Sequence, residues 1–114
     1  MVLMICLVLA GGSACTNIFK KPLSSEQDVA AALKSTEAAV TAKDWPKARQ
    51  EWERTSNAWK RVRDRVRLNS DENEITNFER SLARLEAAIQ VENEGAALAE
   101  IREMNVLWHD LARF

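Results

Sequence analysis

The stretch from Trp45 to Arg67, WPKARQEWERTSNAWKRVRDRVR, points to an all-helical fold. Its less polar residues advance by three and four positions, the spacing of a helix with one buried face. Asp44 precedes the stretch as a candidate N-cap, and Pro46 is tolerated in a first turn because its missing N–H would have no intrahelical partner. We therefore expect a helix over residues 45–67. Its buried stripe would be Trp45, Ala48, Trp52, Thr55, Trp59, Val62 and Val66.

The same spacing recurs on both sides of this stretch and predicts three more helices, over residues 25–42, 71–92 and 94–112. Candidate caps precede them: Ser24, with Gln27 at capping-box spacing, then Ser70, then Asn93. The connections are short, so consecutive helices should be antiparallel. We expect an all-α, small antiparallel four-helix bundle. Its core residues would be Trp45, Trp52, Trp59, Phe78, Leu82, Leu85, Ile101 and Trp108.

A weak internal repeat has a period of about 49 residues. The shift aligns Asp44 with Asn93, Ala48 with Ala97, and Trp59 with Trp108. Two helical hairpins of similar length would look alike by chance, and a duplicated hairpin with tetratricopeptide-like packing would give the same matches. Two units are too few for a solenoid, so either origin predicts a closed arrangement.

The three tryptophans of the first stretch allow two interpretations. Trp45, Trp52 and Trp59 are seven residues apart and share one stripe. Exposed indoles on such a stripe would suit a carbohydrate or a cationic ligand. Core filling is favoured, since this spacing is what a bundle core requires and the alanine-rich first helix leaves room for large rings.

The N-terminal segment MVLMICLVLA, residues 1–10, is uninterrupted apolar sequence followed by Gly11-Gly12-Ser13-Ala14-Cys15. It is short for a permanent membrane span and typical of an export signal. Small residues before Cys15 resemble a bacterial lipobox, in which the cysteine is lipidated and becomes the new N-terminus. We expect a leader over residues 1–15, a tether over 16–23 and a helical domain over 24–114. Soluble export and an uncleaved N-terminal anchor are the alternatives.

The composition favours binding over catalysis. The 114 residues carry 16 Lys and Arg against 17 Asp and Glu, for a net charge of −1, which argues against nucleic acid as a main partner. His109 is the single histidine, and neither Glu103 nor Asp110 shares its helix face. We therefore expect no catalytic residues, no metal site and no cofactor.

The most charged stretch, residues 60–67, has five cations and one acid, and its cations form a candidate interaction surface. Complementing the dipole at a helix C-terminus explains part of this pattern. Contact with anionic lipid headgroups or wall polymers is the functional alternative. The residues concerned are Lys60, Arg61, Arg63, Arg65 and Arg67.

Several of these motifs occur together in one known family. The chain combines a lipoprotein-like leader, Asp44-Trp45 opening a helix, Trp52 and Trp59, an acidic turn before Ile75, and the motif Ser81-Leu82-Ala83-Arg84-Leu85. This order resembles the domain-of-unknown-function family numbered 4363, short exported helical proteins of Gram-positive bacteria. The resemblance implies location and fold, and no activity. Family members often carry histidine in the turn before the third helix, where this chain has Asn69-Ser70-Asp71-Glu72.

These observations predict a non-catalytic, membrane-tethered, extracytoplasmic protein that serves the cell envelope either as an interaction module, contacting an unidentified envelope protein, or as a structural module. It would be displayed on the outer face of the cytoplasmic membrane, or secreted if no anchor remains. The alternative is a binder of an anionic envelope polymer, a lipid headgroup or a small ligand, through the tryptophan stripe and the basic helix end.

Overall fold

A computed structural model of the chain describes residues 26–111, and these form four α-helices without a β-strand. The predicted all-α four-helix bundle is confirmed, with helix bounds within one or two residues of those expected from the spacing. The proposed leader, tether and Cys15 lie outside the described residues. The helices are α2 (Glu26–Thr41), α3 (Trp45–Arg67), α4 (Glu72–Gln90) and α5 (Glu94–Leu111).

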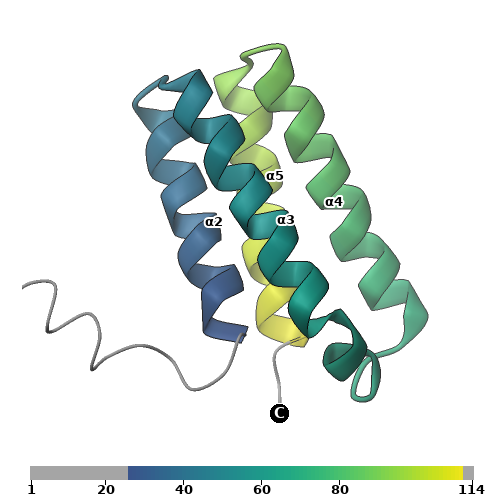
Figure 1. The fold of residues 1–114 in the computed structure, drawn as a ribbon. Coiled ribbons are helices and arrows are strands. Elements are labelled where there is room, and N and C mark those ends of the chain that lie inside the picture. The colour runs from purple at the N-terminus through teal and green to yellow at the C-terminus, as the bar shows by residue number, and fades with distance from the viewer. Residues whose placement is uncertain (1–25, 112–114) are drawn as a thin grey trace, which may run out of the picture.

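Each helix runs antiparallel to the next, and the four close into a bundle (Figure 1). The α2–α3 and α4–α5 hairpins make the most extensive contacts, and they join through α2 against α5 and α3 against α4. If the hairpins are exchanged, so that α2 takes the place of α4 and α3 that of α5, the α2–α5 interface takes the place of the α3–α4 interface. The architecture is therefore that of two like hairpins facing each other.

Two of the predicted helix caps are confirmed and one is corrected, while the predicted Ser24 cap lies outside the described residues. The side chains of Asp44 and Asn93 accept from the third residue of their helices, Lys47 N at 3.3 Å and Ala96 N at 3.0 Å. The Ser70 cap was predicted wrongly, because α4 begins at Glu72 and Asp71 is the residue that immediately precedes it. Its carboxylate accepts from Glu74 N at 2.8 Å and also complements the positive end of the helix dipole.

The turn between α2 and α3 is a left-handed helix ending of the Schellman type. Lys43 has a φ of 56°, which lets Asp44 N donate to Ala39 O at 2.9 Å and Lys43 N donate to Val40 O at 2.9 Å. These bonds satisfy carbonyls that the end of α2 would otherwise leave unpaired.

The turn between α4 and α5 repeats this geometry 49 residues later. Glu92 has the same φ of 56°, Asn93 N donates to Ala88 O at 2.9 Å, and Glu92 N donates to Ile89 O at 3.0 Å. Sequence and structure thus repeat with the same period. The left-handed ending is common where helices stop, so the match shows that the two turns are built alike and leaves both origins of the repeat open.

Replacing Lys43 or Glu92 by glycine should stabilise the fold by about 1 kcal/mol each, because both residues hold a left-handed backbone that is costly for residues with a side chain. The Lys43–Glu94 ion pair, 3.9 Å long and exposed, offsets little of this gain. Urea unfolding would measure it. Lys34→Gly, on an exposed position within α2, is the control and should destabilise the chain. Destabilisation by all three substitutions would contradict this account of the turns.

The core contains most of the predicted residues. Trp59, Phe78 and Trp108 form its aromatic centre, with ring centroids 4.6 Å apart for Trp59–Phe78 and 6.3 Å apart for Trp59–Trp108. Leu82, Leu85 and Ile101 are also buried. These aromatic rings supply much of the apolar area that stabilises the bundle.

The core assignment was wrong for Trp45 and Trp52, which are only partly buried and pack against the edge of the core. The three tryptophans are spaced by seven residues, which is slightly less than two full turns of a straight helix with 3.6 residues per turn. Each step of seven therefore rotates the side chain by about 20° around the helix axis. Trp59 faces the centre, and the two earlier indoles drift toward the surface.

Candidate functional site

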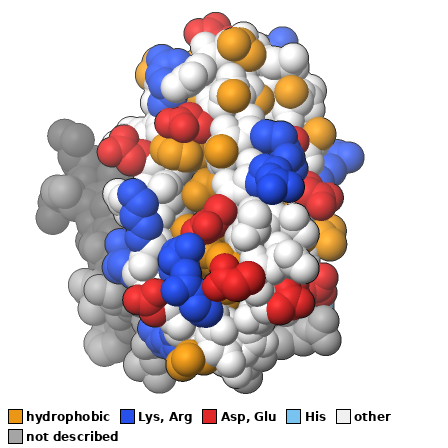
Figure 2. Space-filling view, turned by 90° about the vertical axis from the view of Figure 1, so that its right-hand side faces the viewer, with side chains coloured by type: hydrophobic (Ala, Val, Ile, Leu, Met, Phe, Trp, Pro, Cys, Tyr) orange, Lys and Arg blue, Asp and Glu red, His pale blue; other side chains and the backbone are white. Residues whose placement is uncertain are grey.

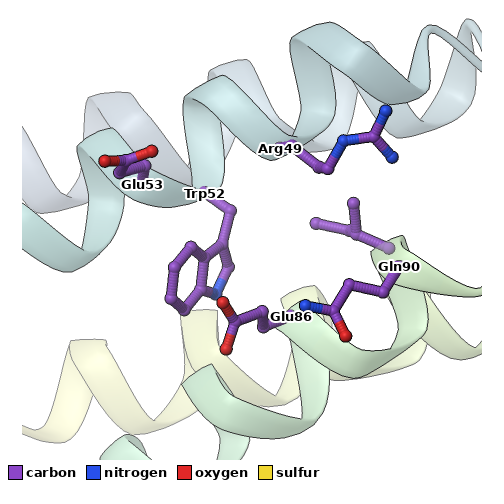
Figure 3. A pocket seen from close by; sticks show the side chains of 6 residues that line it. Arg49, Trp52, Glu53, Glu86 and Gln90 are labelled. Atoms are coloured by element: carbon purple, nitrogen blue, oxygen red, sulfur yellow. The ribbon is translucent and has the colours of Figure 1, made fainter.

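A groove of about 160 Å³ lies between α3 and α4. The indole of Trp52 extends from α3 toward α4, with Arg49 and Glu53 on either side of it along the helix (Figure 3). Glu86 and Gln90 project from α4 toward the same space (Figure 3). Ile89 completes the lining, so the groove combines apolar surface with a polar rim.

Trp52 is held in one orientation within this groove. Its Nε1–H donates to the backbone oxygen of Leu82 at 2.9 Å, which ties α3 to α4. The indole remains partly exposed. It therefore offers a fixed aromatic surface to solvent, which reduces the entropy a ligand would have to overcome on stacking against it.

The rim of the groove carries both signs of charge and an amide. Arg49 and the Gln90 amide can donate hydrogen bonds, and the carboxylates of Glu53 and Glu86 can accept them. Within residues 26–111, no hydrogen bond or ion pair engages these four side chains. Together they provide hydrogen-bond donors and acceptors around one aromatic ring.

The basic stretch at the end of α3 is largely used within the bundle. Arg61 Nη2 lies 3.8 Å from Asp28 of α2, Arg67 Nε lies 3.2 Å from Glu72 of α4, and Arg63 pairs with Glu79 of α4. Arg65 also has an interaction within the chain, and Lys60 is exposed. The face that carries α4 shows basic and acidic side chains interspersed (Figure 2). The five predicted cations therefore do not form one uncompensated surface.

Arg63 and Glu79 belong to a partly buried network with Trp59. Trp59 Nε1 donates to Glu79 Oε2 at 2.8 Å, and Arg63 donates to both carboxylate oxygens of Glu79. Burial raises the pKa of Glu79, but the hydrogen bonds from Arg63 and Trp59 outweigh it and hold the pKa below its ordinary value. The same pairing raises the pKa of Arg63. The network thus anchors the aromatic centre to the α3–α4 interface.

Protonating Glu79 should weaken the fold. Its pKa is lower in the folded chain, so its contribution to stability is complete above the unfolded value near 4.5 and is lost as the pH falls through the folded pKa. Wild type should therefore lose more unfolding free energy between pH 6 and pH 3 than Glu79→Gln. Urea unfolding at both pH values would measure this, with Glu103→Gln on an exposed position as control. Equal losses in wild type and Glu79→Gln would contradict a stabilising role for the ionised carboxylate.

Among residues 26–111, no group of three His, Cys, Asp or Glu side chains could hold a metal ion, and His109 is exposed on α5. Over the same range, no helix is long and apolar enough to cross a membrane.

Trp52 was predicted as a core residue, with ligand binding by the tryptophan stripe as the alternative. The polar residues that line the groove were not predicted. Arg49 and Glu53 flank Trp52 on α3, and Glu86 and Gln90 are four residues apart on α4, so each pair alone carries a weak signal. The signal lies in their combination, which requires knowing that these faces of α3 and α4 meet.

The fold and the groove together define a small helical bundle domain built from two like hairpins, with one partly exposed tryptophan between them. The chain belongs to the family described as Domain of unknown function (DUF4363), whose model matches residues 18–113. The resemblance read from the motifs is thereby confirmed. Searches with the chain find no matching curated protein and no matching solved structure.

Proposed function

We propose that the protein is a non-catalytic module of the cell envelope, exported and held at the outer face of the cytoplasmic membrane by a lipid on Cys15. The apolar leader and the small residues before Cys15 support export and lipidation. Residues 16–25 separate Cys15 from the first described helix. Fully extended, ten residues reach about 35 Å, enough to place the bundle beyond the headgroups.

The observation that carries a binding role is the groove at Trp52. Its polar side chains are unengaged within residues 26–111, whereas the basic residues Arg61, Arg63 and Arg67 are engaged in ion pairs. Side chains that do not stabilise the bundle, gathered around a fixed indole, are suited to recognition. We therefore assign partner recognition to the helical domain, with the groove as its centre.

The alternative binder of an anionic polymer or lipid headgroup is favoured less by the geometry. Such binding gains from uncompensated cations, and each ion pair in the basic stretch already neutralises one of them. The small-ligand form of this alternative is favoured by the groove itself, since the lining residues offer both donors and acceptors.

Changing Cys15 to serine should move the protein out of the lipidated membrane fraction, because serine cannot form the thioether. In wild type, a fatty-acid analogue should label the protein. Cys6→Ser is the matched control, since Cys6 lies in the apolar core of the leader and would be removed with it. Fractionation combined with labelling of each variant would make the measurement.

The two other modes of export give different results in this experiment. An uncleaved anchor would leave both variants in the membrane without label, and soluble export would leave wild type in the medium. Either result would contradict lipidation at Cys15.

A further inference from the structure

We infer that the Trp52 groove binds one pyranose ring of a saccharide, with the ring stacked on the indole and its hydroxyls bonded to the polar rim. The inference deepens the proposed binding role and is independent of the anchor. Four observations carry it: the size of the groove, its mixed chemistry, its fixed indole and its divergence from the equivalent position in the second hairpin.

The size of the groove suits a single ring. Its volume is about 160 Å³. A cavity of about 150 Å³ is known to hold a benzene ring, so the groove is of the size that covers one face of a single six-membered ring. Drug-sized ligands use pockets of roughly 300–1,000 Å³, and the groove falls below that range.

The chemistry of the lining favours a neutral polyol over an apolar ring or a cation. Trp52 and Ile89 offer apolar surface, which matches the C–H face of a pyranose. Glu53 and Glu86 can accept from hydroxyls while Arg49 and Gln90 donate to them. An apolar ring would leave these groups without partners. A cation would be attracted by Glu53 and Glu86 and repelled by Arg49, and it would leave Arg49 and the Gln90 amide without acceptors.

The orientation of the indole is set before any ligand arrives. The hydrogen bond from Trp52 Nε1 to Leu82 O fixes the ring relative to α4, the helix that carries Glu86 and Gln90. Stacking surface and hydrogen-bonding groups therefore keep a constant relation to each other, and less entropy is lost on binding.

The second hairpin shows that the bundle does not require such a groove. Shifted by 49 residues, Trp52 corresponds to Ile101 and Arg49 corresponds to Leu98. Ile101 is completely buried and Leu98 packs against the core, so aliphatic side chains occupy the equivalent positions of α5. At the position between α3 and α4, a tryptophan and an arginine border open space instead. The open space beside Trp52 is therefore not a requirement of the repeated fold, and it is available to a ligand.

The test is a titration of the full chain in nanodiscs, followed by the indole N–H signals of its four tryptophans. The probes are methyl β-glucopyranoside and the trisaccharide of N-acetylglucosamine, with tetramethylammonium as the cationic comparison. The Trp52 signal should shift with a Kd on the order of 1 mM, as expected for a small ligand in an open groove. The signals of buried Trp59 and Trp108 should move far less.

Three variants examine the assignment of the site. Trp52→Leu should abolish saccharide binding, and Trp45→Leu, at a partly buried tryptophan outside the groove lining, should retain it. Since Trp52→Leu also loses a hydrogen bond and could destabilise the chain, Glu86→Gln at the rim serves as the milder variant. It should weaken binding by roughly fivefold, because an ionised acceptor becomes neutral.

Two results would overturn the inference. One is the absence of a Trp52 shift with either saccharide up to about 50 mM, well above the expected Kd. The other is a shift with tetramethylammonium alone, which would assign the groove to a cation. If either result is obtained while Cys15 is shown to be lipidated, the saccharide inference fails and the proposal of a lipid-anchored module is unaffected.

Discussion

Replacing Trp59 by alanine should lower the free energy of unfolding by about 3–5 kcal/mol, the largest loss expected for any single side chain in the bundle. Trp59 is only 2% exposed. It contacts both Phe78 and Trp108 and donates a hydrogen bond to Glu79. The substitution leaves a cavity among the remaining rings and also removes a donor that stabilises the Glu79 carboxylate.

Urea unfolding followed by circular dichroism would measure this loss, and Trp45→Ala is the matched control. Trp45 is partly buried at the first position of α3, so its truncation should cost about 1 kcal/mol, as is usual for a side chain at the edge of a core. Similar losses for the two variants would contradict the division between a central and a peripheral tryptophan.

Enlarging Ala48 or Ala97 to leucine should destabilise the fold by about 1–3 kcal/mol in each case. Both alanines are completely buried, one near the start of α3 and one near the start of α5. A leucine has no space there unless the helices move apart. Thermal unfolding would compare these variants with Ala99→Leu, an exposed position on α5 where little change is expected.

The comparison also examines the repeat, since Ala48 and Ala97 are equivalent under the 49-residue shift. Their losses should match within about 1 kcal/mol, given the usual context dependence of such effects. A large loss at one position and none at the other would contradict equivalent packing in the two hairpins.

The helices could be predicted from the sequence because their determinants are local. The spacing of apolar residues and the caps Asp44 and Asn93 gave bounds within one or two residues of those observed. The 49-residue separation of the two turns could also be predicted, from matched positions such as Asp44 and Asn93. The cap of α4 was predicted at Ser70, one residue before the observed cap Asp71, because the two residues are adjacent and both are good N-caps.

The groove could not be predicted in the same way because it depends on distant contacts. Trp52 and Leu82 are 30 residues apart, and their hydrogen bond requires a particular rotation of α3 against α4. The ion pairs of Arg61 and Arg63 likewise join α3 to α2 and α4. From sequence alone these arginines form a basic run, and only the packed bundle shows which acids they meet.

The central claim is that the chain recognises an envelope partner through the Trp52 groove. Photo-crosslinking in living cells measures this most directly, with a photoreactive residue in place of Gln90 at the rim of the groove or of Asn105, an exposed residue on α5. We expect an adduct from position 90 that is lost on adding Trp52→Leu, and much less adduct from position 105. Equal adducts from both positions, or an adduct from position 90 that persists with Trp52→Leu, would contradict recognition at the groove.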